Sequence, residues 1–119
     1  MASAQDHRDC AAENERLYNF IGGADSDWPD WAVTVAFYVI VHEASAFLAD
    51  RKLPVPRGHD GMKVALGADP AWANLLGYYE SAQGDANRTR YRCYRPQKQE
   101  VQLAAVRIGL VRAEIAALP

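Results

Sequence analysis

Cysteine and histidine are scarce in this sequence. Its 119 residues include only Cys10 and Cys93, and only three histidines, His7, His42 and His59. The two cysteines match neither a metal-binding spacing nor a disulfide framework, and the dispersed histidines form no zinc ligand set. We therefore expect no metal, no cofactor and no disulfide, as in a reduced, cytoplasmic setting.

The motifs of several enzyme classes are missing as well. The pair His42-Glu43 starts like the zinc-protease motif HExxH, but Ala46 stands where that motif has its second histidine. The segment IGGADS, residues 21–26, lacks the lysine of a phosphate-binding P-loop. No G-x-S-x-G stretch is present either, so the sequence shows no serine-hydrolase elbow.

Long apolar runs are limited to one segment. Trp31–Ala49 is long enough to span a membrane, but it carries His42 and Glu43 near its middle, where a charge is costly. The first twenty residues are polar and acidic, unlike a signal peptide. We expect a helix buried at the centre of a bundle and no membrane association, with a membrane span as the alternative.

What is present predicts a single all-α domain, residues 1–119. Half of the residues are hydrophobic, which is enough for a core at this length. Helix start and stop signals, such as Gly22-Gly23, Ser26-Asp27 and Asp69-Pro70, divide the chain. The predicted helices, which would form an up-down bundle of four to five helices, are Ser3–Ile21, Asp30–Lys52, Asp60–Gly67, Pro70–Tyr91 and Pro96–Ala117.

Two apolar stripes follow the last predicted helix, roughly 145° apart. The stripe expected to pack into the bundle is Val101, Ala104, Ile108, Val111, Ile115 and Leu118. The second stripe is Leu103, Val106, Leu110, Ala113 and Ala117. It needs cover from more of the same bundle or from a second chain, so a homodimer is one of two open expectations.

Charge is distributed unevenly along the chain. Residues 1–50 hold nine acids and two bases, whereas residues 51–119 hold six acids and eleven bases. In the most basic stretch, residues 87–98, the candidate ligand-binding residues are Arg88, Arg90, Tyr91, Arg92, Tyr94, Arg95 and Lys98. Guanidinium forks suit phosphate oxygens and tyrosine rings suit stacking on bases, which predicts RNA or another phosphorylated ligand. Alternatively, these cations favour a helix C-terminus, pair with the acidic first half or are simply solvated.

Two histidines are candidate catalytic groups. His42 shares a helix face with Tyr38 and has a structural alternative, a buried imidazole bonded to a tyrosine or a carboxylate. His59 precedes a predicted helix start in the basic segment Arg51–Lys63, where an anion would be favoured. It is alternatively a helix cap in a solvated turn.

Three segments in this order resemble the HEPN superfamily: DWAVTVAFYVIVHEASAFLADRKL (residues 30–53), PRGHDGMKVAL (56–66) and YYESAQGDANRTRYRCYRPQKQEVQLAA (78–105). The resemblance implies a compact bundle of four or five helices that commonly dimerises. It also implies RNA binding, metal-independent RNA cleavage, or a role in toxin–antitoxin or defence systems with an antitoxin-like nucleotidyltransferase as partner.

In the RNase members of that superfamily, an R-x4–6-H motif supplies both catalytic groups. Counted from Arg88 and from Arg90, the positions for histidine hold other residues, namely Cys93, Tyr94, Arg95, Pro96 and Gln97. Arginine does not exchange protons near neutral pH. Three hypotheses therefore stand: an RNA- or phosphate-binding domain without the usual catalysis, an RNase that pairs His42 or His59 with an arginine, and a dimerisation or protein-interaction module.

Overall fold

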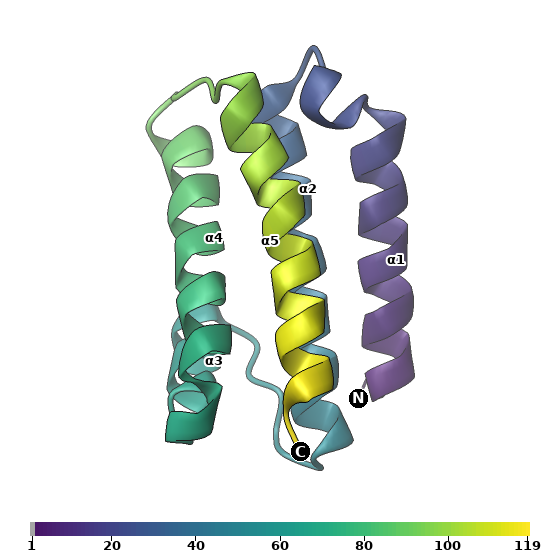
Figure 1. Cartoon of the computed structure of the whole chain (residues 1–119), viewed down its shortest axis with the longest axis vertical. Helices are drawn as coiled ribbons and strands as arrows, with labels where there is room; N and C mark the ends of the chain where they lie inside the picture. Colours follow the sequence, from purple (N-terminus) through teal and green to yellow (C-terminus); the bar gives the residue numbers. More distant parts are fainter. Residues whose placement is uncertain (1) are drawn as a thin grey trace.

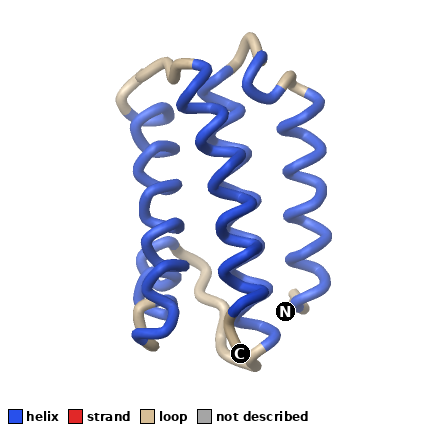
Figure 2. The backbone as a smooth tube through the Cα atoms, in the orientation of Figure 1, coloured by secondary structure: helices blue, strands red, loops and turns tan. Residues whose placement is uncertain are grey.

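A computed structural model describes residues 2–119, which fold into a helical bundle (Figure 1). Its α-helices are α1 (Ala4–Phe20), α2 (Pro29–Asp50), α3 (His59–Leu66), α4 (Ala73–Tyr91) and α5 (Lys98–Ala117). Two short 3-10 helices are η1 (Gly23–Asp25) and η2 (Pro70–Trp72). No strand occurs among residues 2–119 (Figure 2), and the prediction of an all-α bundle is confirmed.

Helix α2 lies at the centre of the bundle. The four long helices alternate in direction, and both ends of the chain lie at the same end of the molecule (Figure 1). α2 packs against α1, α4 and α5, and 14 of its 22 residues are buried, as expected for a helix that is apolar on all sides. By length and composition alone α2 is also a candidate membrane span, yet most of that stretch is buried inside the bundle.

The chain reverses between α1 and α2 at the predicted glycine pair. Gly22 has φ 105°, in the left-handed region, and a Cβ there would lie 3.0 Å from the Cα atom of Ser26. The predicted caps of α2 are wrong by one or two residues. Its N-cap is Trp28, whose N–H bonds the Ser26 hydroxyl, and Pro29 is the first helical residue.

Two predicted helix starts differ from the structure. The predicted cap Asp69 is present, since its carboxylate accepts the N–H of Ala71, but the helix predicted from Pro70 is the separate turn η2 followed by α4 from Ala73. The helix predicted from Pro96 begins at Lys98, because Gln97 and Glu100 cap each other's backbone. Most of the other predicted ends agree within one or two residues, which is the usual uncertainty.

The two stripes of α5 differ in burial. Val101, Ala104, Ile108 and Val111 lie in the core. In the second stripe, Leu103, Val106 and Leu110 are 49%, 57% and 42% exposed. The bundle of residues 2–119 therefore does not cover this stripe, and the expectation that it would is wrong.

Candidate nucleic-acid interface

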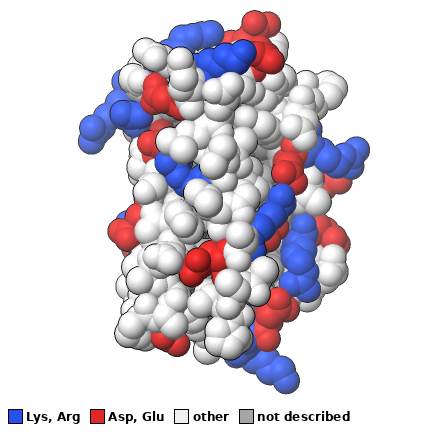
Figure 3. All heavy atoms as spheres, in the orientation of Figure 1, with Lys and Arg blue, Asp and Glu red and all other residues white. Residues whose placement is uncertain are grey.

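The basic stretch lies at one end of the bundle, where α4 passes into α5. Cys93 turns the chain with φ 52°, a left-handed conformation, and Pro96 is buried just before α5. Lys and Arg side chains gather over this turn at the upper left of Figure 3. The seven predicted binding residues therefore lie near one another, but they do not all have the same partners.

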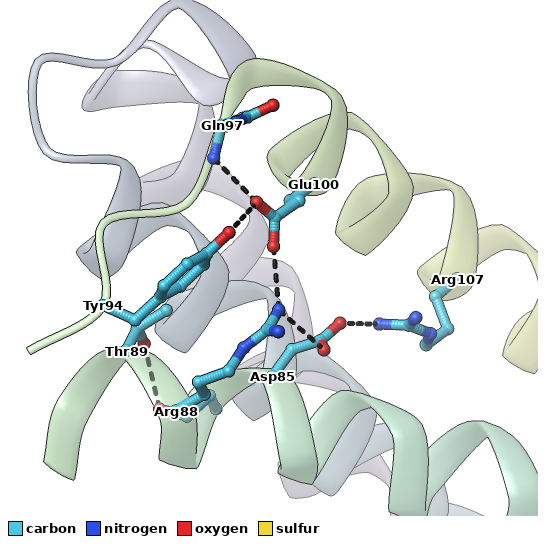
Figure 4. Close-up of polar contacts among 8 residues, drawn as sticks. Asp85, Arg88, Thr89, Tyr94, Gln97, Glu100 and Arg107 are labelled. Carbon is cyan, nitrogen blue, oxygen red and sulfur yellow. Dashed lines mark hydrogen bonds and ion pairs between the residues drawn. The ribbon is translucent and has the colours of Figure 1, made fainter. Parts of the chain in front are cut away.

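One group of these side chains joins α4 to α5 (Figure 4). The guanidinium of Arg88 lies 2.8 Å from a Glu100 oxygen and 3.8 Å from an Asp85 oxygen, and it stacks over the ring of Tyr94. The Tyr94 hydroxyl donates to Glu100. On the other side of Asp85, Arg107 makes an ion pair of 2.9 Å. We name this group of Asp85, Arg88, Tyr94, Glu100 and Arg107 the α4–α5 latch.

Hydrogen bonds and a nearby cation favour the ionised form of the Glu100 carboxylate in the latch. The pKa of Glu100 is lowered because Tyr94 donates to its carboxylate, the Gln97 N–H donates to it, and Arg88 lies beside it. The same hydrogen bond raises the pKa of Tyr94. Arg88 and Tyr94 thus have intramolecular partners, which favours a structural role for them over ligand binding.

Two more predicted residues contact the acidic first half of the chain. Lys98 lies 2.7 Å from Asp25, and Arg95 donates to the backbone carbonyl of Asp27 at 3.2 Å. The Lys98 pair is largely exposed to solvent, so it contributes little to stability and is open to exchange for a ligand. The alternative in which the cations pair with the first half applies to these two residues.

Arg90 and Tyr91 instead face a hollow between the start of α2 and the end of α4. The hollow has a volume of about 270 Å³ and is lined by Asp30, Trp31, Thr34, Thr89, Arg90 and Tyr91. We name it the α2–α4 hollow. Trp31 is 59% exposed and Tyr91 is 71% exposed, so both rings are accessible to a ligand. A second hollow shares Asp30, Thr89 and Arg90 with the first and continues past Cys93 to Tyr94 and Arg95.

The geometry at Arg90 combines a cation with aromatic surface. Its guanidinium donates to the Tyr38 hydroxyl at 3.1 Å and lies 5.1 Å from the Tyr91 ring centre. A larger depression of about 600 Å³ lies along α1, but its one cation, Arg16, is held by Glu13 at 2.6 Å. The α2–α4 hollow is therefore the better candidate for binding an anion.

His59 lies close enough to this region for Arg90 to act on it. It is the first residue of α3, after the N-cap Gly58, so it is not the cap itself. Its Nδ1 atom is 2.8 Å from the hydroxyl of Tyr79, and its ring packs on Phe37. Burial lowers the pKa of His59, and the charges of Arg90 and Lys63 lower it further. Burial raises the pKa of Tyr79 to about 12, so Tyr79 remains a neutral phenol.

His42 lies elsewhere, between α1 and α2. Its Nδ1 atom is 3.2 Å from Nδ1 of His7, which replaces the tyrosine or carboxylate expected as its partner. Burial lowers the pKa of His42, and His7 lowers it further. His59, rather than His42, is connected to Arg90 through packed rings: its ring lies on Phe37, and Phe37 lies against Tyr38. The Tyr38 hydroxyl accepts from Arg90.

Several residues of this region were missed by sequence reasoning. Trp31, Thr34 and Tyr38 line one face of α2 opposite the end of α4, and Asp30 begins the same face. Trp31 and Tyr38 are seven residues apart in sequence, a spacing that puts both on one helix face. What the sequence lacked was a signal for which neighbouring helix that face would meet.

Neither a metal set nor a known relative defines the site. Among residues 2–119, no three His, Cys, Asp or Glu side chains come together as metal ligands. Comparisons with protein-family models, with curated proteins and with solved structures find no match for this chain. The interpretation of the hollow therefore rests on its own geometry.

Proposed function

We propose that this chain is an HEPN-like helical domain that binds single-stranded RNA through the α2–α4 hollow. The observation that carries the proposal is that Arg90 shares this hollow with two exposed aromatic side chains, Trp31 and Tyr91. Stacking of a base on an aromatic ring contributes about 1–3 kcal/mol and tolerates any sequence. A guanidinium next to these rings supplies a forked contact to the adjacent phosphate.

The neighbouring cations extend the same surface. Arg95 lines the second hollow together with Arg90, and Arg92 is exposed on the turn between them. Duplex RNA would present its bases stacked and paired, whereas an unpaired strand offers both base faces and phosphates. Single strands are therefore the form of RNA that this combination of rings and cations fits.

The test is anisotropy titration of a short labelled single-stranded RNA. We expect Trp31→Ala to weaken binding about tenfold, because it removes one stacked base. Trp28→Ala is the matched control, since Trp28 is 56% exposed but lines neither hollow. Arg90→Ala should also reduce the slope of log K against log salt by about 0.7, the value for one phosphate contact. Unchanged affinity in both Trp31→Ala and Arg90→Ala would contradict the proposal.

A second candidate function, metal-independent RNA cleavage, is favoured by the influence of Arg90 on His59. Because burial and two cations keep His59 neutral near pH 7, it is able to accept a proton. In such a reaction His59 takes the proton of a ribose 2′-hydroxyl, the 2′-oxygen bonds to phosphorus, and the P–O5′ bond breaks as the leaving 5′-oxygen takes a proton from water. Arg90 would stabilise the charge on the phosphate oxygens. The products are a 2′,3′-cyclic phosphate and a 5′-hydroxyl end.

Cleavage is tested on a denaturing gel with tRNA and single-stranded RNA in EDTA. Products that vanish in His59→Ala but persist in His42→Ala would support this mechanism, because His42 has a different partner. If the wild-type protein leaves the RNA intact, the cleavage hypothesis is contradicted and RNA binding remains as the proposed function. Cleavage that persists in His59→Ala would contradict the assigned role.

A homodimer is the third part of the proposal, with a second copy covering the exposed stripe of α5. Leu103, Val106 and Leu110 are exposed on α5, the helix at the front of the view in Figure 1. Light scattering should give a dimer mass that Val106→Asp reduces to a monomer mass. A wild-type monomer at high concentration would instead leave this face for a different protein, such as an antitoxin-like nucleotidyltransferase.

A further inference from the structure

An acidic residue, Asp30, belongs to the surface proposed to bind RNA. It lines both hollows beside Arg90. Its backbone carbonyl accepts a hydrogen bond from the Thr34 hydroxyl. Among residues 2–119, its carboxylate takes part in no ion pair within 4.0 Å and in no side-chain hydrogen bond.

Asp30 has a structural role that accounts for its presence but not for its position in the hollow. An acid in the first turn of a helix is stabilising, and Asp30 occupies the first turn of α2. A free carboxylate next to Arg90 would nevertheless repel a phosphate placed against it. A nucleotide in the hollow must therefore direct its phosphate to Arg90 and hydrogen-bond donors to Asp30.

The four bases differ in the donors they offer to a carboxylate, which only accepts hydrogen bonds. Guanine presents N1–H and the N2 amino group side by side, matching the two carboxylate oxygens. Adenine and cytosine place an acceptor nitrogen next to their amino group, and uracil flanks its N3–H with two carbonyl oxygens. In each of these three bases an acceptor lone pair would face the negative carboxylate. The resulting repulsion disfavours adenine, cytosine and uracil, while two hydrogen bonds favour guanine.

We propose that Asp30 makes the α2–α4 hollow selective for an unpaired guanine. The base stacks on Trp31 or Tyr91, donates from N1 and N2 to the carboxylate, and places its phosphate at Arg90. This inference rests on the proposed RNA binding and adds the base that the site reads. A bidentate base contact of this kind corresponds to a preference of about tenfold over the other bases.

The experiment compares labelled uridine hexanucleotides that carry one central guanosine, adenosine, cytidine, uridine or inosine. A single guanosine avoids four-stranded structures, and inosine keeps N1–H but lacks the N2 amino group. We expect the guanosine oligomer to bind about tenfold more tightly than the adenosine, cytidine and uridine oligomers, with inosine between them. Asp30→Asn should remove the preference, because its amide replaces one acceptor by a donor. Asp27→Asn is the matched control, since Asp27 is the acid nearest to Asp30 in sequence and lines neither hollow.

The outcomes separate this inference from the proposed function. Equal affinity for all five oligomers, with binding still lost in Trp31→Ala, overturns guanine selectivity and leaves RNA binding in place. A guanosine preference that survives in Asp30→Asn also overturns the role of Asp30. Binding of none of the oligomers overturns RNA binding itself. Because the inosine comparison needs no variant, the inference stays testable even if Asp30→Asn does not fold.

Discussion

Arg88 and Arg90 are two residues apart in sequence but belong to different parts of the molecule. Arg88 lies in the α4–α5 latch between Asp85 and Glu100, whereas Arg90 faces the α2–α4 hollow and bonds Tyr38. Successive helical residues are rotated by about 100°, so these two side chains leave α4 in nearly opposite directions. A run of cations in a sequence is therefore not one binding surface until the helix faces are known.

The acids on each side decide how much positive charge is available to a ligand. On the latch side, two carboxylates and a tyrosine occupy the Arg88 guanidinium. On the hollow side, the lining residues include one acid, Asp30. The comparison predicts that the latch carries stability and the hollow carries binding.

The largest effect on stability is expected from Asp85→Ala. The side chain of Arg107 is only 11% exposed, and this substitution removes its carboxylate partner. We expect a loss of about 2 kcal/mol in the free energy of unfolding, between the values for exposed and fully buried pairs. Urea denaturation measures it, with Glu80→Ala on the same helix as the control. Equal stability of the two variants would show that the latch is not structural.

An intermediate effect separates the two arginines directly. Arg88→Ala should lower the free energy of unfolding by about 1 kcal/mol, as for a partly exposed ion pair, and change RNA affinity less than twofold. Arg90→Ala should weaken RNA binding about tenfold, the loss of a charge-assisted contact, with a smaller change in stability. Both variants are measured by urea denaturation and by RNA titration. If Arg88→Ala weakens binding more than Arg90→Ala, the division between latch and hollow is wrong.

The smallest expected effect is the change in stability with pH. The pKa values of His42 and His59 are lowered from 6.5 in the fold, mainly by burial, so the unfolded chain binds more protons and stability falls as pH drops below 6.5. The pKa of Glu100 is lowered from 4.5, so the latch loses its stabilisation only below pH 4.5. Urea midpoints should thus begin to decline at two points, near pH 6.5 for the histidines and near pH 4.5 for Glu100. His59→Gln should flatten part of the decline that starts near pH 6.5 and Glu100→Gln part of the decline that starts near pH 4.5, and the reverse assignment would contradict the cited shifts.

Much of the fold was predictable because its signals are local. The glycine pair after α1, Pro29 at the start of α2 and the apolar character of α2 on all sides each act within a few residues. The cap at Asp69 and the proline after it were predicted, but the separation of the turn η2 from α4 was not. The start of α5 was misplaced because a mutual cap, not the proline, defines it.

The candidate site was predictable only in part. Arg90 and Tyr91 were found from composition, since a cation beside an aromatic residue is visible in sequence. Trp31 and Asp30 were not found, because they join the site across the contact between α2 and α4. His42 and His59 were both candidates in the sequence, but their partners His7 and Tyr79 come from different helices and could not be predicted from it.

The sequence by itself determined the all-α class, the central position of α2 and the stretch, residues 87–98, where positive charge is concentrated. These properties follow from hydrophobic periodicity, helix start and stop signals and local charge, all of which depend on residues close together in sequence. Tertiary structure alone decided that Arg88 is held by Glu100 while Arg90 lines a hollow together with Trp31. Which side chains meet depends on the rotation and register of packed helices, and those are set by how the whole core fills its volume.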